Sequence, residues 1–184
     1  LTKGDIIEYY ERISELMLPH LRDRALVMHR FPDGIDSDGF YHKQVPDHFP
    51  AWIDRTTVKT SDGTQTLVVC NKQSTLAYLA NQGCITPHRW LSRTDEPDHP
   101  DLLIIDLDPP GNDFAPVRSA AQQCRALCDE LEISSFLMTT GSRGLHVVIP
   151  LDRSADFDTV RSTARDMMTV LAARHADELT TEQR

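Results

Sequence analysis

The chain lacks any apolar stretch long enough to cross a bilayer. Its longest apolar runs are about five residues, whereas a transmembrane helix needs roughly 20, so an integral membrane protein is excluded. Positive charge is also scarce, because 19 Lys and Arg residues stand against 28 Asp and Glu residues, for a net charge of −9. This balance excludes a uniformly basic, histone-like binder of nucleic acid but leaves room for a local basic groove.

Metal-binding cysteine motifs are missing as well. The four cysteines, Cys70, Cys84, Cys124 and Cys128, show no CxxC or CxH spacing, so we expect free, buried or half-buried thiols rather than a zinc site. A reduced, cytoplasmic setting follows. The composition is 40% hydrophobic and 26% charged, which excludes disorder because such a chain can bury a core.

Hydrophobic periodicity predicts a mixed α/β (α+β) fold. A capping box at Thr2 and Asp5 begins a helix that we expect to end before Pro19. Other elements of the first half are expected as strands at 25–31, 40–44 and 65–71, a helix at 74–81, an extended segment at 84–91 and a polar loop at 94–100. Trp52 is expected to fill the core.

The second half is more regular. Its expected elements are a strand at 102–107, a helix at 114–131, strands at 135–139 and 145–151 and a helix at 156–173. The order strand, helix, strand, strand, helix is a split α/β unit that resembles the core of an RNA-recognition-motif fold.

Asp106 and Asp108 are the most informative pair. Side chains alternate along a strand, so both carboxylates are expected on one face, at the end of an apolar strand. Two like charges so placed favour Mg²⁺ or Mn²⁺ between them, because hard cations prefer oxygen ligands. The alternative is a pair of surface residues where a strand meets a turn.

A glycine turn separates the last two strands. Gly141 and Gly144 allow the backbone to curl so that successive N–H groups face one point, and Thr140, Ser142 and Arg143 would add further donors for a triphosphate. His146 follows on the outgoing strand. A plain hairpin with a histidine at the edge of the core is the alternative. Beside a carboxylate pair, the turn favours nucleotidyl transfer.

The motifs together resemble the polymerase domain of bacterial ligase D, of the archaeo-eukaryotic primase superfamily, which acts in non-homologous end joining. The motifs are at 2–5 (TKGD), 30–34 (RFPDG), 40–44 (FYHKQ), 90–92 (WLS), 106–110 (DLDPP), 140–146 (TGSRGLH) and 150–151 (PL). The resemblance implies a primase-like catalytic core, with its RNA-recognition-motif-like sheet packed against an N-terminal α/β module.

The same resemblance implies a metal-dependent nucleotidyltransferase that adds nucleotides, preferably ribonucleotides, at DNA ends and gaps during double-strand break repair. Asp106 and Asp108 match the catalytic, metal-binding aspartates, with Mn²⁺ or Mg²⁺ as the metal. Positions that match nucleotide-binding residues are Thr140, Ser142, Arg143, His146, His88, Phe40 and Tyr41. Lys3 matches a lysine that binds the 5′-phosphate of DNA, and Lys43 and Arg30 are candidate DNA contacts.

The chain departs from the family pattern in three ways. Arg143 and Thr140 stand where the family often has Lys and Ser, and both keep the donor function. A second phosphate-binding lysine is absent. The family's third metal-binding aspartate is expected beyond Arg184, so the chain alone is expected to lack part of its catalytic machinery. The domain at 1–184 is expected to be incomplete at both ends, with an N-terminal module at 1–100 and a core at 101–184. Asp152, Asp156 and Asp158 are expected to cap the last helix instead.

The implied partners are DNA ends with a 5′-phosphate, NTP or dNTP, and possible links to Ku and an ATP-dependent ligase, fused or separate. No membrane partner is expected, and the location is cytoplasmic and nucleoid-associated. Two other functions stay open. One is a catalytically incomplete module that binds and bridges 5′-phosphorylated ends; the other is a nuclease or phosphoesterase using the same carboxylates, which would not need a triphosphate cradle.

Overall fold

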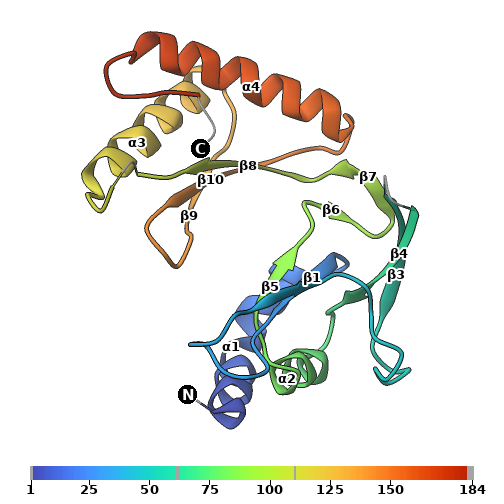
Figure 1. Cartoon of the computed structure of the whole chain (residues 1–184). Coiled ribbons are helices and arrows are strands. Elements are labelled where there is room, and N and C mark those ends of the chain that lie inside the picture. The colour runs from blue at the N-terminus through green and yellow to red at the C-terminus, as the bar shows by residue number, and fades with distance from the viewer. Residues whose placement is uncertain (1, 61–62, 110, 182–184) are drawn as a thin grey trace. The chain divides into compact units, whose positions relative to one another are not determined.

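A computed structural model describes residues 2–60, 63–109 and 111–181. Residues 61 and 62, Pro110 of the 106–110 motif and the chain end at 182–184 lie outside the described residues. The chain divides into two compact units, residues 1–97 and 98–184. Each is described by itself, with the element labels of Figure 1.

The first unit packs two helices against a five-stranded sheet. Its elements are α1 (Lys3–Leu21), β1 (Ala25–Arg30), β2 (Phe40–His42), β3 (Arg55–Thr60), β4 (Gly63–Val69), α2 (Gln73–Asn81), β5 (Cys84–Arg89) and β6 (Ser92–Arg93). The strand order is β2-β1-β4-β3, with β5 paired to β1. The central strand β1 is therefore the element that positions both β2 and β5.

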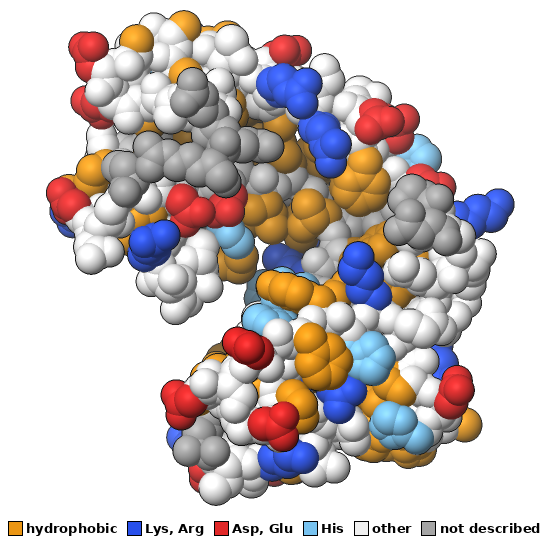
Figure 2. Space-filling model, in the orientation of Figure 1, with side chains coloured by type: hydrophobic (Ala, Val, Ile, Leu, Met, Phe, Trp, Pro, Cys, Tyr) orange, Lys and Arg blue, Asp and Glu red, His pale blue; other side chains and the backbone are white. Residues whose placement is uncertain are grey.

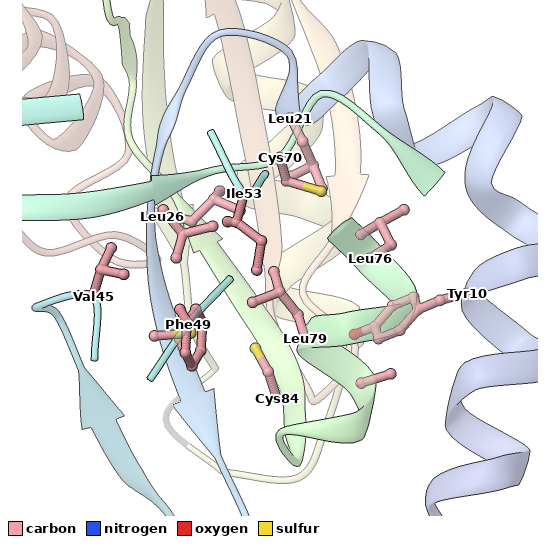
Figure 3. Close-up of a cluster of buried hydrophobic side chains, with 13 residues drawn as sticks. Tyr10, Leu21, Leu26, Val45, Phe49, Ile53, Cys70, Leu76, Leu79 and Cys84 are labelled. Carbon is pink, nitrogen blue, oxygen red and sulfur yellow. The ribbon is translucent and has the colours of Figure 1, made fainter. Parts of the chain in front are cut away.

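The main core of this unit lies between β1 and the two helices, as Figure 3 shows. Leu26 and Met28 alternate along β1 and are completely buried. The Tyr10 hydroxyl donates a 2.5 Å hydrogen bond to the carbonyl of Ile85, which ties α1 to β5. Cys70 and Cys84 are buried, free thiols of the same core, as expected.

Four expectations for residues 1–100 need correction. Pro19 lies inside α1, which continues to Leu21 because that residue is buried and anchors the last turn. The strand β3 was not expected, since its threonine-rich sequence buries only Val58. The expected polar loop at 94–100 contains β7 (Glu96–Pro100), which pairs with β6. Trp52 is 47% exposed and contacts Tyr78 edge-to-face rather than filling the core.

The second unit has the topology expected of an RNA-recognition-motif-like core. Its elements are β8 (Leu102–Leu107), α3 (Ala115–Glu130), β9 (Phe136–Thr139), β10 (Leu145–Pro150) and α4 (Phe157–Arg174). The three strands form an antiparallel sheet in the order β8-β10-β9. Figure 1 shows α3 and α4 on the same side of that sheet.

Strand alternation determines what each face of this sheet carries. Ile105, Leu145 and Val147 pack into the helix-facing core with Cys124 and Cys128. Asp106 and His146, their neighbours along the strands, therefore lie on the face away from the helices. No helix among the described residues is long and apolar enough to cross a membrane.

Asp156 caps α4, as expected, by accepting a hydrogen bond from the backbone N–H of Thr159. Asp152 does not cap α4: it accepts hydrogen bonds from the backbone N–H and the hydroxyl of Ser154, in the loop before the helix. These bonds lower the pKa of both carboxyl groups. Both aspartates therefore stabilise the local structure before and at the start of α4.

Candidate functional site

The two aspartates of β8 lie where the sequence places them, at the end of an apolar strand. Asp106 is the penultimate residue of β8, and Asp108 is the first residue after the strand. Both aspartate side chains are exposed, while the side chain of Ile105, which packs toward the helices, is buried. Among the described residues, Asp108 forms no ion pair, so its carboxylate remains available to a cation.

The pairing of β8 with β10 brings the glycine turn beside this carboxylate pair. Leu107 is opposite Leu145, and Asp106 is opposite His146. Residues 140–144, which immediately precede β10, therefore lie next to the end of β8. The motifs at 106–108 and 140–146, separated by a whole helix in the sequence, form one site.

Gly144 is required by this close approach. A Cβ built on it would lie 2.7 Å from Oδ1 of Asp108 and 2.8 Å from the carbonyl oxygen of Leu107. Neither distance leaves room for a methyl group. Glycine here lets the turn approach the carboxylate, whereas Gly141 supplies the left-handed backbone of the turn at φ +82°.

Thr140 organises the turn from within. Its Oγ1 accepts hydrogen bonds from the backbone N–H groups of Ser142 and Gly144, at 3.3 and 3.2 Å, and donates to the carbonyl of Gly144. The side chains of Ser142 and Arg143 are exposed. In this arrangement the hydroxyl and guanidinium donors that face solvent come from Ser142 and Arg143, and Thr140 holds them in position.

His146 links the turn to the carboxylates. Its Nε2 lies 3.3 Å from Oδ1 of Asp106. Its Nδ1 is buried and has no hydrogen-bond partner within residues 2–60, 63–109 and 111–181, and buried polar atoms normally have one. Within the described residues, no group of three or more His, Cys, Asp or Glu side chains forms a metal cluster, so the second unit offers two carboxylates with a histidine alongside.

The residues expected from the first unit form two groups on opposite faces of its sheet. On one face, the ring of Tyr41 lies edge-on to His88, with ring centroids 5.2 Å apart. Burial lowers the pKa of His88, and the neighbouring His29 lowers it further, so a neutral imidazole is favoured. Figure 2 shows histidine and hydrophobic side chains side by side on the visible surface of this unit.

Phe40 belongs to the other face, although it adjoins Tyr41 in the sequence. The guanidinium of Arg30 lies 5.6 Å from the centre of the Phe40 ring, and it hydrogen-bonds to Nδ1 of His42 and to Gln82. Neighbouring residues of a strand point to opposite faces. The structure therefore does not bring Phe40 and Tyr41 together as one stacking pair.

The remaining cationic candidates are dispersed. Lys3 is exposed in the first turn of α1, and Lys43 is exposed just after β2. Arg24 is 3% exposed and donates to the carbonyls of Trp90 and Ser92, so its charge is used inside the unit.

Sequence reasoning missed His29. The residue showed no ligand spacing, yet its ring stacks on Tyr41 with centroids 4.4 Å apart and an angle of 12° between the planes. Only the pairing of β1 with β2 makes them neighbours, since His29 is directly opposite Tyr41. The one signal for this contact in the sequence is the alternation of side chains between the two faces of β1.

Comparisons with known proteins show the family to which the chain belongs. A family model described as the LigD primase-polymerase domain matches residues 2–184. The multifunctional non-homologous end joining protein LigD of Mycobacterium bovis is 34% identical over 97% of this chain, and the bifunctional LigD of Bacillus subtilis is 34% identical over 84%. The chain spans only 24% of the length of each of these two relatives.

A solved structure shares the fold. The polymerase domain of Mycobacterium tuberculosis ligase D, in complex with DNA, superimposes with a TM-score of 0.92 at 29% sequence identity. The match covers 99% of this chain and 67% of that one.

Proposed function

Because the chain belongs to the LigD primase-polymerase domain family, we propose that it is a nucleotidyltransferase that adds nucleotides at the ends and gaps of broken DNA. The observation that carries the proposal is the antiparallel register of β8 and β10, in which Asp106 is opposite His146. A carboxylate pair and a donor-rich glycine turn thereby adjoin, as nucleotide addition from a triphosphate requires.

The residues at the end of β8 fit a divalent cation. Asp106 and Asp108 offer exposed oxygen ligands on one strand end, which suits Mg²⁺ or Mn²⁺. The turn fits the same use, because a Cβ at Gly144 would occupy the space against Asp108. A bound cation would neutralise charge on the triphosphate and favour deprotonation of the attacking 3′-hydroxyl.

The chain's own groups would position the nucleotide. Ser142 and Arg143 would bind phosphate oxygens, with Arg143 able to contact two oxygens at once. Thr140 would hold the turn that carries both. His146, whose Nε2 lies 3.3 Å from Oδ1 of Asp106, would keep that carboxylate oriented.

The first unit would bind DNA and bases. Tyr41 and His88 would contact a base, since aromatic rings stack on bases without regard to sequence. Lys3 would bind the 5′-phosphate of the downstream strand, with Arg30, Lys43 and Phe40 as further contacts. The proposal extends to a preference for ribonucleotides, to Ku and an ATP-dependent ligase as partners, and to a cytoplasmic, nucleoid-associated location, where broken DNA ends occur.

Primer extension on a 5′-phosphorylated gapped duplex tests the proposal, with ATP and dATP in Mn²⁺ and in Mg²⁺. It is run on the 184-residue chain and on the full product of its gene. We expect extension by the full product, strongest with ATP and Mn²⁺. Binding of DNA ends without any extension by the full product would overturn the polymerase proposal in favour of an end-bridging module.

A further inference from the structure

Strand β9 is an exposed, apolar edge of the second unit's sheet. The strand order is β8-β10-β9, so within the described part of the chain β9 is paired along one side only. All four of its residues are exposed, with Phe136 at 62% and Leu137 at 61%. Neither a charged residue nor a proline interrupts the strand. A free apolar edge of this kind is a template for pairing with another strand.

The edge strand β3 of the first unit is different. It is the last strand in the order β2-β1-β4-β3, and its exposed residues are Arg55, Thr57 and Lys59. Charged side chains on an edge strand, lysine above all, oppose pairing with the edge of another chain. The edge at β3 is therefore protected against association, and the edge at β9 is not.

A groove lies beside β9 on the side of the sheet that the helices occupy. Its volume is about 690 Å³, and its apolar floor includes Leu137, Leu145 and Val147. Leu137 is directly opposite Val147 in the pairing of β9 with β10, and Val147 belongs to the helix-facing core. Helix α3 packs over β10 and leaves Leu137 exposed. The groove therefore extends the apolar surface of the edge strand.

One stripe of α3 forms the polar wall of this groove. Its members are spaced four, three and four residues apart and are all exposed: Arg118, Gln122, Arg125 and Asp129. Residues at this spacing lie on one face of a helix. Reversing the direction of the stripe places Arg118 opposite Asp129. It also places Gln122 opposite Arg125, so the stripe is complementary to itself, as a two-fold interface requires.

Antiparallel pairing of two β9 strands brings two such stripes face to face. A two-fold axis perpendicular to the sheet at Leu137 places this residue opposite its own counterpart, and Phe136 opposite Met138 of the other copy. Directly opposite residues share a face of the sheet, so this register keeps the helices of both copies on one side. Neighbouring strands lie about 4.8 Å apart, so the two α3 helices, each over its β10, are roughly 14 Å apart. An arginine and an aspartate extended toward each other bridge that distance.

We propose that β9 and the α3 stripe form a two-fold interface between two copies of this chain. Main-chain hydrogen bonds between the β9 strands join the two sheets into one, and Leu137 of each copy is buried between the α3 helices. A stable interface buries roughly 1,000 Å² or more. Two short strands do not provide this area, and the α3 stripes contribute the rest. The inference goes beyond the proposed function and does not depend on it.

Arg118 of each copy pairs with Asp129 of the other. Within one chain, Asp129 already lies 3.5 Å from Nε of Arg125. Its carboxylate has about four lone-pair sites and therefore accepts a second guanidinium. Because both pairs form at once in a two-fold arrangement, the charges of the two stripes are balanced at both ends of the interface.

Sedimentation velocity of the full gene product, over a wide range of protein concentration, tests the interface. We expect a dimer in the wild type. We expect Leu137→Lys to raise the dimer dissociation constant at least about tenfold, a loss of about 1.4 kcal/mol, because lysine on an edge strand opposes pairing. Val170→Lys is the matched control, since Val170 is 45% exposed on α4 and does not line the groove. We expect this control to remain dimeric.

An exchange of charges tests the two-fold geometry. Arg118→Asp places two carboxylates opposite each other at both ends of the interface, and Asp129→Arg places two guanidinium groups there. Each variant alone should therefore dimerise more weakly than the wild type. Mixing the two variants should restore a dimer, because every aspartate then faces an arginine. Thermal melting checks that each variant is folded, and both residues are exposed.

The opposing results are distinct. A full product that stays monomeric at every concentration overturns the proposal, and a dimeric 184-residue chain beside it would show that the rest of the protein covers β9. Leu137→Lys and Val170→Lys variants that dimerise equally well or equally poorly also overturn it, because the interface then lies elsewhere. Mixed charge variants that fail to associate would refute the two-fold register.

Discussion

Nε2 of His146 lies 3.3 Å from Oδ1 of Asp106, across the pairing of β10 with β8. The two residues are 40 positions apart in the printed sequence, and the antiparallel register alone makes them neighbours. The contact joins the strand that carries the carboxylates to the turn that carries the phosphate donors. The candidate site therefore depends on this pairing of the two strands.

Asp106→Ala tests the metal role of this pair. We expect nucleotide addition to be abolished, because one of two carboxylate ligands is lost. The side chain of Asp106 is 60% exposed, and its removal relieves repulsion with Asp108, so the melting temperature should stay near the wild-type value. Primer extension and thermal melting check the two parts. A large fall in melting temperature would indicate a structural role instead.

Gly144→Ala should distort the site. The new Cβ would lie 2.7 Å from Asp108 Oδ1, and overpacking of this kind typically costs about 1–3 kcal/mol. We expect a lower free energy of unfolding, measured in urea, together with a loss of nucleotide addition. Gly111→Ala is the control, because a Cβ there would meet nothing within 4 Å. Similar effects of the two substitutions would contradict the close approach at Gly144.

Acid should destabilise the first unit through His88. Burial, and secondly the neighbouring His29, lower the pKa of His88 below its ordinary value of 6.5. At acid pH the unfolded chain then binds more protons than the folded one, so stability rises with pH and is lost as pH falls below 6.5. Urea unfolding between pH 5 and pH 8 measures the slope. His88→Phe should reduce that slope, and an unchanged slope would refute the assignment.

The thiols should be unreactive in the folded chain. Burial raises the pKa of Cys70 and of Cys84 to about 12, and that of Cys124 to about 11. Because the thiolate is the reactive form, we expect Ellman's reagent to label these three cysteines at pH 8 only after unfolding. Above the ordinary value of 9.0, unfolded thiols ionise first, so stability should fall as pH rises further. Rapid labelling of the native chain would contradict this burial.

Lys3→Ala should weaken binding to DNA in a phosphate-dependent way. Lys3 is exposed at the start of α1, where helix dipole and ammonium charge both favour an anion. We expect a greater loss of affinity for 5′-phosphorylated gaps than for unphosphorylated ones, measured by fluorescence anisotropy. Lys59→Ala, on exposed β3, serves as the control. Equal losses on both substrates would remove the assignment of Lys3 to the 5′-phosphate.

Local signals predicted most elements of the fold. The capping box of Thr2 and Asp5 begins α1 as expected, and the apolar run at 102–107 is β8. Such features depend on neighbours along the chain, which a sequence contains completely. Where the elements were wrong, as for Pro19 and for β3, a tertiary contact or a partner strand outweighed local preference.

The sequence by itself determined the chemistry that is available: two carboxylates one pleat apart, a turn with two glycines and several donors, and motifs that resemble one family. Tertiary structure decided which groups meet. Register with β8 placed His146 on Asp106 and confined Gly144 against Asp108. Pairing of β2 with β1 put Tyr41 on His29 and sent Phe40 to Arg30. The physical reason is that strand pairing depends on residues distant in sequence, and a shift of one residue in register would move every side chain to the opposite face.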